Sequence, residues 1–261
     1  MKIISWNVNG IRAVAKKGFS DWLRKSGADI ICLQETKAFF SQVENDLKCP
    51  EGYNSYWHNG KVPGYAGVVT YSKQKPININ TSFDTELEVF KNDGRVVEIE
   101  FSSFILLNIY FPNGSPRSDG TEMLSHKLKF YEVFLNYINK LRSNGKKIII
   151  LGDYNIAHTE IDIARPKENE NSIGFLPIER AWITKIIDNG YIDVFRHFNP
   201  NIRDVYSWWS YRTKARERNI GWRLDYIFIT PDLLNNTKSI GYQTEITGSD
   251  HCPVFIELNF D

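Results

Sequence analysis

Polar side chains, nearly all of them oxygen-bearing, lie at the ends of most of the strand-length apolar runs in this sequence. They are Asn7, Asn9, Glu35, Tyr110, Asn113, Asp153, Asn155, Asp225, Asp250 and His251. The set contains carboxylates, amides, a phenol and one imidazole, but no cysteine. Such donors suit a hard cation, Mg²⁺ or Mn²⁺, better than they suit zinc. Because a hard cation held by a few carboxylates commonly acts on phosphate esters, the set indicates phosphate chemistry.

Each of these residues also has an ordinary structural interpretation. Asn7 and Asn113 lie near glycines and are typical of turns. Asp153 could cap the segment that follows it, Glu35 could be a surface residue, and His251 could be a hydrogen-bonded structural histidine. Their shared position at the ends of buried strands favours function, since chance gives no reason for it.

The stretch from Arg203 to Arg223 combines basic and aromatic side chains. It contains Arg203, Arg212, Lys214, Arg216, Arg218, Arg223, Tyr206, Trp208, Trp209, Tyr211 and Trp222. Basic side chains neutralise phosphates, and aromatic faces stack on bases or sugars, so the stretch favours a nucleic-acid surface. The alternative is a tryptophan core beneath a solvated basic face. We expect Trp208 or Trp209 in the core, because alternate residues of a strand face opposite ways.

Strand-length runs outnumber helical patterns in this chain. The expected strands are 2–8, 28–33, 68–71, 95–101, 104–110, 148–151, 206–209, 224–229 and 254–258, and the expected helices are 19–26, 125–142 and 177–189. Several strands follow one another without a helix between them, which favours a mixed-sheet α/β sandwich over a parallel doubly wound sheet. No repeat or linker-like segment interrupts the pattern, so we expect one domain over residues 1–261.

Composition narrows the class of protein. The chain has 261 residues and a formal net charge of only +1, so a nucleic-acid contact must come from a local basic patch. Three cysteines without a C-x-x-C pair argue against a disulfide framework or a zinc site. The N-terminus has no signal-peptide shape and no apolar run has membrane length. We therefore expect a cytoplasmic protein that does not contact membranes.

Six motifs, taken in order, closely resemble the exonuclease III family of apurinic/apyrimidinic (AP) endonucleases, and within it the animal-like branch found in bacteria and archaea. They are SWNVNGIR at 5–12, LQETK at 33–37, NIYFPNG at 108–114, GDYNIAH at 152–158, GWRLDY at 221–226 and GSDHCP at 248–253. The resemblance implies a four-layer DNase I-like sandwich, two mixed β-sheets face to face with helices outside. It also implies Mg²⁺-dependent cleavage of DNA 5′ to an abasic site, leaving a 3′-hydroxyl, with 3′-end trimming and 3′→5′ exonuclease activity.

The resemblance further implies roles for single residues. Asp153 would orient or deprotonate the attacking water, and Asn155 would hold that water or a phosphate oxygen. His251 would contact the scissile phosphate while Asp225 fixes its orientation, and Tyr110 would also contact the phosphate. The implied metal set is Glu35, Asn7, Asp153, Asn155, Asp250 and His251.

The implied DNA contacts come from seven residues. They are Asn113, Arg212, Trp208, Trp222, Leu224, Tyr65 and Lys214. Trp208, Trp222 and Leu224 would wall a pocket for the extruded abasic sugar, and Arg212 would wedge into the kinked duplex. Asn9 departs from the family, because animal enzymes carry an aspartate there, and this departure argues against a second metal site.

The expected partner is double-stranded DNA with abasic sites or blocked 3′ ends, bound by a monomer.

Three other functions remain open at this point. A nonspecific nuclease or a phosphoinositide phosphatase of the same superfamily is the nearest alternative, and a noncatalytic DNA-binding protein is the alternative of another class. Nicking beside deoxyuridine is a further activity of some archaeal relatives that this chain could share.

Overall fold

The structure is a computed structural model that describes residues 1–83 and 88–260. One sheet contains β1 (Lys2–Asn7), β2 (Ile30–Gln34), β3 (Asn54–His58), β4 (Val68–Ser72), β11 (Thr237–Tyr242) and β12 (Val254–Leu258). The other contains β5 (Asn78–Asn80), β6 (Val96–Glu100), β7 (Ile105–Tyr110), β8 (Ile148–Asp153), β9 (Ile192–Asp193) and β10 (Asp225–Ile229). The helices are α1 (Ile11–Ala15), α2 (Phe19–Lys25), α3 (Asn45–Lys48), α4 (Glu88–Lys91), α5 (Leu124–Ser143), α6 (Pro166–Asn169), α7 (Pro177–Asp188) and α8 (Val194–Phe198).

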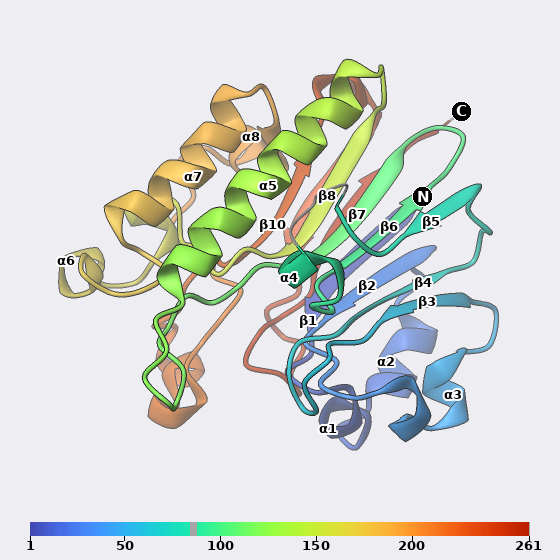
Figure 1. The fold of residues 1–261 in the computed structure, drawn as a ribbon, viewed down its shortest axis with the longest axis horizontal. Helices are drawn as coiled ribbons and strands as arrows, with labels where there is room; N and C mark the ends of the chain where they lie inside the picture. The colour runs from blue at the N-terminus through green and yellow to red at the C-terminus, as the bar shows by residue number, and fades with distance from the viewer. Residues whose placement is uncertain (84–87, 261) are drawn as a thin grey trace.

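The two sheets pack face to face, with helices on both outer faces (Figure 1). The strand orders are β11-β12-β1-β2-β4-β3 and β5-β6-β7-β8-β10-β9. Each sheet is mixed, because β1 runs parallel to β2 and antiparallel to β12, while β8 runs parallel to β7 and antiparallel to β10. Helices α5 and α7 cover the second sheet, and α1 to α3 lie against the first (Figure 1). The predicted mixed-sheet sandwich is confirmed.

Strand β8 shows why its sequence is apolar without alternation. Ile148 and Ile150 pack in the core beneath α5, whereas Ile149 and Leu151 pack between the two sheets. Both faces of the strand are therefore buried, which a continuous apolar run satisfies. Helix α5 presents Phe130, Phe134 and other buried residues to the same outer core and ends before Gly145, whose φ is +74°.

One predicted strand is wrong. Residues 206–209 form no strand; the structure gives only isolated bridges from Trp208 to Trp222 and to His251. Tyr206, Ser207 and Trp209 are all buried, so the alternation of a half-exposed strand is broken. Trp208 pairs with Trp222 on one side and with His251 on the other, so this segment connects the stretch before β10 to the stretch before β12. Trp209 is the buried tryptophan of the pair, as expected.

The strand register brings the polar strand ends together. In the second sheet, Asp153 lies directly opposite Tyr110 on β7 and Asp225 on β10. In the first sheet β12 runs antiparallel to β1, so His251, just before β12, lies near the end of β1 at Asn7. The ends of both sheets thus meet at one end of the sandwich. Among the described residues, no helix is both long and apolar enough to span a bilayer.

Candidate active site

Asp153 lies at the centre of the strand-end cluster and is almost fully buried. Its Oδ2 accepts hydrogen bonds from Asn7 Nδ2 at 2.8 Å and from Asn155 Nδ2 at 3.2 Å. Its Oδ1 accepts the backbone N–H of Asn155 at 2.9 Å. The bond from Asn7 crosses from one sheet to the other, so Asp153 joins the two halves of the site. Asn113 Nδ2 donates to Asn155 Oδ1 at 3.0 Å and extends the network toward solvent.

His251 and Asp225 form a buried pair beside this carboxylate. His251 Nδ1 lies 2.8 Å from Asp225 Oδ2, and His251 Nε2 lies 3.8 Å from Asp153 Oδ2. Burial lowers the pKa of His251, but the carboxylates of Asp225 and Asp153 outweigh it and raise the pKa above its ordinary value. The ring is therefore held as an imidazolium whose Nδ1 is engaged and whose Nε2 remains for an anion.

The pKa of Asp153 is also raised. Burial is the main cause, with contributions from the nearby carboxylates of Asp225 and Glu35, while His251 acts in the opposite direction. A buried carboxyl with a raised pKa is suited to accept a proton at neutral pH. Tyr110 is buried in the same group, and burial with the negative charge of Glu35 raises the pKa of its phenol well above normal.

The donors that fit a hard cation lie beside Glu35. Glu35 Oε1 accepts a hydrogen bond from Asn7 Nδ2 at 3.0 Å, and Lys37 Nζ lies 2.6 Å from Oε2. Burial raises the pKa of Glu35, but Lys37 and Asn7 outweigh it, so the pKa is lowered and the carboxylate stays charged. Asp153 adds a carboxylate oxygen to the same network, and carboxylate oxygens of this kind fit Mg²⁺ or Mn²⁺. Asn7 turns its Nδ2 to both carboxylates, while its Oδ1 accepts the backbone N–H of Asn9 at 3.0 Å.

A second group of candidate ligand atoms comes from Asp153, Asp225 and His251. These atoms lie within 4.8 Å of one another. Because Asp225 and His251 share a hydrogen bond, the two are better described as a hydrogen-bonded pair than as ligands of one ion. This favours Glu35, Asn7 and Asp153 as the cation-binding side of the site.

A cavity of about 610 Å³ opens beside the polar cluster. Its polar lining includes Glu35, Asn155 and His251, and its apolar wall includes Trp222 and Leu224. Trp208 lines it as well, and the Trp208 and Trp222 rings meet edge to face at 6.0 Å between centroids. The cavity can therefore hold a compact, weakly polar group against the polar cluster.

Comparison with known proteins places this geometry in a family. A match to the Endonuclease/Exonuclease/phosphatase family spans residues 4–251. The chain belongs to this family. An exodeoxyribonuclease of Bacillus subtilis is 42% identical over 260 residues, covering 99% of this chain and 100% of the relative. A DNA-(apurinic or apyrimidinic site) endonuclease of Dictyostelium discoideum is 40% identical, covering 99% of this chain and 71% of the relative.

A solved structure agrees. The structure of an AP endonuclease from Archaeoglobus fulgidus matches this fold with a TM-score of 0.85 and 30% sequence identity, covering 100% of both chains. The predicted resemblance to the exonuclease III family of AP endonucleases is confirmed, and so is the DNase I-like sandwich.

The structure brings most of the predicted site residues of this family member together. Asn7, Tyr110, Asp153, Asn155, Asp225 and His251 form the buried cluster together with the partly buried Glu35, and Asn113, Trp208, Trp222, Leu224 and Asp250 border the cavity. Both oxygens of Asp250 are engaged, Oδ1 by Asn9 at 2.8 Å and Oδ2 by Trp208 Nε1 at 3.1 Å. Arg212, Lys214 and Tyr65 are exposed and lie outside the cavity lining.

Arg223 is not part of a basic surface. Its side chain is fully buried, with Nε 2.7 Å from Asp162 and Nη2 2.8 Å from Asp193. The guanidinium also lies over the Tyr226 ring at 4.2 Å. Its position in a basic stretch suggested the surface, and only the folded structure shows the two carboxylates that neutralise it. The predicted nucleic-acid stretch is therefore smaller than the sequence indicates.

Sequence reasoning missed Lys37 and Ser207. Lys37 pairs with Glu35, and its place in the LQETK motif was the available signal. Ser207 is buried, and its hydroxyl accepts the backbone N–H groups of Leu224 at 2.9 Å and Asp225 at 3.0 Å. No local pattern marks such a hydroxyl, because it acts on a segment 17 residues away.

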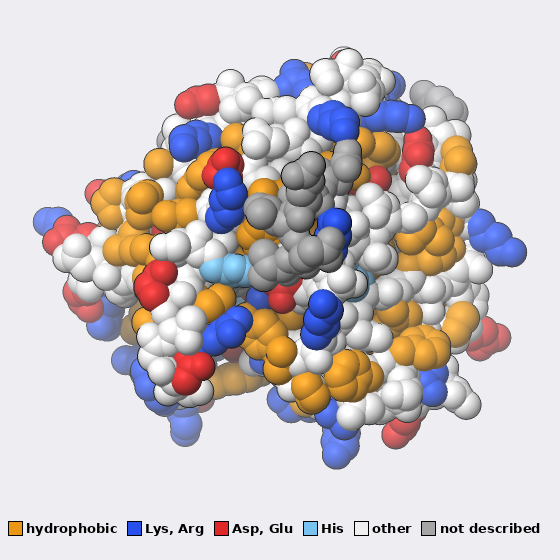
Figure 2. Space-filling model, in the orientation of Figure 1, with side chains coloured by type: hydrophobic (Ala, Val, Ile, Leu, Met, Phe, Trp, Pro, Cys, Tyr) orange, Lys and Arg blue, Asp and Glu red, His pale blue; other side chains and the backbone are white. Residues whose placement is uncertain are grey.

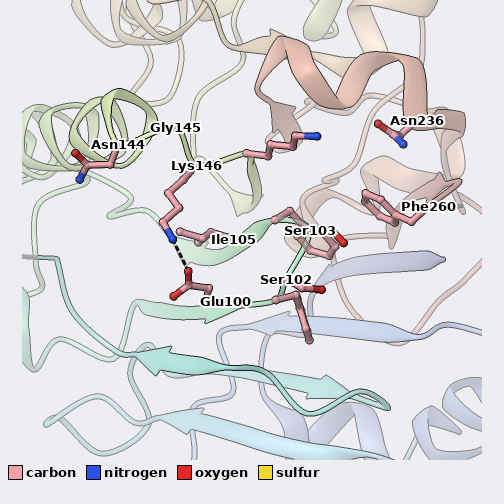
Figure 3. Close-up of a pocket in the computed structure, with 12 residues that line it drawn as sticks. Glu100, Ser102, Ser103, Ile105, Asn144, Gly145, Lys146, Asn236 and Phe260 are labelled. Carbon is pink, nitrogen blue, oxygen red and sulfur yellow. Dashed lines mark hydrogen bonds and ion pairs between the residues drawn. The ribbon is translucent and has the colours of Figure 1, made fainter.

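Another hollow of about 610 Å³ lies at the opposite ends of the strands (Figure 3). It is bordered by the end of β6 at Glu100 and the start of β7 at Ile105. Among the described residues that line it, Glu100 is the only carboxylate, and Lys146 Nζ lies 2.6 Å from it. A single paired carboxylate offers no catalytic arrangement, so this hollow is not the active site.

Exposed basic side chains lie around the active-site end. Arg12, Lys16 and Lys17 line a groove of about 1040 Å³ beside α1, and Lys37 borders both this groove and the catalytic cavity. Lys and Arg side chains are spread along the lower edge of the molecule, the edge at which α1 lies (Figures 1 and 2). Glu44 and Asp46 also line the groove, so its basic character lies on the side of α1 and Lys37, where a polyanion would be attracted.

Proposed function

We propose that this protein is a DNA-repair phosphodiesterase that cleaves DNA 5′ to an abasic site and leaves a 3′-hydroxyl. Trimming of 3′ ends and 3′→5′ exonuclease activity belong to the same site. The observation that carries the proposal is the buried Asp153–His251–Asp225 arrangement, which opens directly into the cavity walled by Trp222 and Leu224. The names of the full-length relatives, an exodeoxyribonuclease and an AP endonuclease, support it.

The residues divide the chemical work. Asp153 holds the attacking water and takes its proton, since burial raises the pKa of its carboxyl. His251 Nε2 donates to a non-bridging phosphate oxygen, and its positive charge stabilises the charge that develops there. Asp225 keeps the ring oriented. Asn155, which Asn113 and Asp153 hold in place, donates to the water or to a phosphate oxygen.

A divalent cation is part of the proposal. We propose Mg²⁺, with Mn²⁺ as a substitute, held by Glu35 and Asn7 with Asp153, Asn155, Asp250 and His251 in reach of the same reaction centre. The bound ion supplies Lewis-acid stabilisation of the phosphate and of the leaving oxygen. Lys37 compensates the charge of Glu35 in the structure and would yield to the ion.

Recognition rests on the cavity beside the polar cluster. We propose that a sugar without its base enters between Trp208, Trp222 and Leu224, and that these walls reject an intact nucleotide. Extrusion is also cheapest where the base is missing. The exposed Arg212 and Lys214 would contact the duplex, and Arg12 and Lys16 would neutralise phosphates along the groove.

One incubation tests the function. A duplex with a single abasic-site analogue is mixed with the protein in Mg²⁺, and a parallel sample contains a chelator. We expect one nick 5′ to the analogue in Mg²⁺ only, and no nick by Asp153→Ala. An uncut abasic duplex alongside degraded undamaged DNA would favour a nonspecific nuclease. Release of phosphate from an inositol phosphate would favour the phosphatase alternative, and binding without cutting would favour a noncatalytic protein.

We further propose that residues 1–261 act as one domain and as a monomer. The two sheets share one core that includes Ile3, Leu106 and Ile149, which supports a single folding unit. Light scattering of the purified protein and a single unfolding transition would test these two statements.

A further inference from the structure

Lys127 and Glu179 form an ion pair that is fully buried and plays no part in the chemistry above. Lys127 lies in the first turn of α5 and Glu179 in the first turn of α7, and neither side chain is exposed. Lys127 Nζ lies 2.5 Å from Glu179 Oε1. Burying two charges in a protein core lowers stability unless each donor and acceptor makes a hydrogen bond. The hydrogen bonds of this pair therefore show what the pair holds in place.

Every N–H of the ammonium has an acceptor. Besides Glu179, Lys127 Nζ donates to the carbonyl of Asn113 at 3.0 Å and to the carbonyl of Asn155 at 2.8 Å. An ammonium has three N–H groups, and the three acceptors use all of them. Asn113 and Asn155 are the residues whose side-chain amides meet each other at the edge of the cavity. One cation therefore fixes the backbone of two neighbouring loops.

The carboxylate extends the same restraint to a third loop. Glu179 Oε2 accepts the backbone N–H groups of Gly174 at 2.6 Å and Leu176 at 3.1 Å. Gly174 lines the cavity, and a Cβ added to it would lie 3.1 Å from the Trp222 ring. At Gly114 an added Cβ would lie 2.8 Å from Cδ of Lys127, so this glycine leaves the space that the lysine stem occupies.

We propose that the Lys127–Glu179 pair is a positioning device for catalysis, which holds the loops of Asn113, Asn155 and Gly174 in their working arrangement. Neither charged residue lines the cavity, so both act through the residues that do. A displacement of Asn155 should affect catalysis most, because its side-chain amide donates to Asp153 at 3.2 Å. Burial lowers the pKa of Lys127, and the carboxylate of Glu179 opposes that shift.

The inference rests on the proposed function and is tested in the same cleavage assay. The variants are Lys127→Met, which keeps the stem and removes the charge, and the double variant Lys127→Met/Glu179→Leu, which replaces the pair by apolar side chains. Replacing a buried ion pair in this way is often neutral for stability, so the double variant keeps the test valid if the single variant fails to fold. Ile138→Ala, a cavity mutation on the same helix, is the control for lost stability.

We expect kcat for abasic DNA to fall roughly 10- to 100-fold in both Lys127 variants with little change in KM, because a misplacement of about 1 Å is sufficient for such a loss. Ile138→Ala, assayed at a temperature where each protein is folded, should keep the wild-type kcat. In an Asn155→Ala background the Lys127→Met change should cost little more, since both act on one group.

Two results would overturn the inference. One is a folded double variant with wild-type kcat, and the other is a Lys127→Met loss that adds fully to the loss from Asn155→Ala. A wild-type protein that leaves the abasic duplex uncut would instead refute the proposed function. The two failures are therefore distinguishable in a single experiment.

Discussion

The pairing of His251 with Asp225 makes the sharpest prediction. Asp225→Asn replaces the carboxylate by an amide of nearly the same shape and removes the negative charge that strengthens a 2.8 Å hydrogen bond between buried groups. A hydrogen bond to a charged group contributes about 1.5–3 kcal/mol, and about 1.4 kcal/mol changes a rate tenfold. We therefore expect kcat to fall roughly 10- to 150-fold if this bond acts in the transition state.

The same variant should change the pH dependence in a defined direction. Burial lowers the pKa of His251, and the carboxylates of Asp225 and Asp153 raise it beyond the ordinary value. Without the charge of Asp225 the pKa falls, so the ring loses its proton at lower pH and the alkaline limb of kcat/KM moves to lower pH.

The assay is cleavage of a duplex with one abasic-site analogue, at saturating Mg²⁺, across neutral and alkaline pH. Asp232→Asn is the matched control, since it makes the same change at an exposed carboxylate in the segment Pro231–Asn236. Circular dichroism must show that both variants are folded at each pH. An Asp225→Asn protein with the wild-type rate and an unmoved alkaline limb would refute the role given to this pair.

Three other perturbations have expected outcomes. Trp222→Ala should leave the rate on abasic DNA nearly intact but lower the ratio of kcat/KM for abasic over undamaged duplex, because the cavity wall is lost. Glu35→Gln should raise the Mg²⁺ concentration that half-saturates cleavage, and an unchanged Mg²⁺ titration would contradict its place as a ligand. Burial raises the pKa of Asp162, but Arg223 and Arg196 outweigh it and lower the pKa. The stability that this carboxylate contributes is therefore present above about pH 4 and lost as the pH falls. In Asp162→Asn the free energy of unfolding should consequently decrease less between neutral and acid pH than in the wild type.

The sequence indicated which residues would lie together where those residues stand at the end of a predicted strand. Asp153 follows an apolar run buried on both faces, and Asp225 opens another, so both are visible as strand ends. The register that places them opposite each other is a consequence of pairing two such strands antiparallel. The contact from Asn7 to Asp153 was not predictable, because it depends on how the two sheets stack and not on any local pattern.

Buried charge was the main source of error. Arg223 has the residue type and the neighbours of a DNA-binding arginine, but its partners lie 61 and 30 residues away in the chain. Lys127 and Glu179 are 52 residues apart and occupy ordinary helix positions. A single sequence does not show such pairs, since each charge by itself is more typical of the surface.

The segment from Trp222 to Asp225 links recognition to chemistry. Trp222 and Leu224 wall the cavity, while Asp225 orients His251, and the segment is fixed between them by Arg223 on Asp162 and Asp193. Backbone displacement at Arg223 would therefore move the wall and the histidine partner together. We expect Arg223→Met to lower both the selectivity for abasic DNA and kcat, whereas Trp222→Ala and Asp225→Asn separate the two effects. If Arg223→Met lowered the melting temperature but changed neither kinetic quantity in the folded protein, the two functions would not share this segment as a common support.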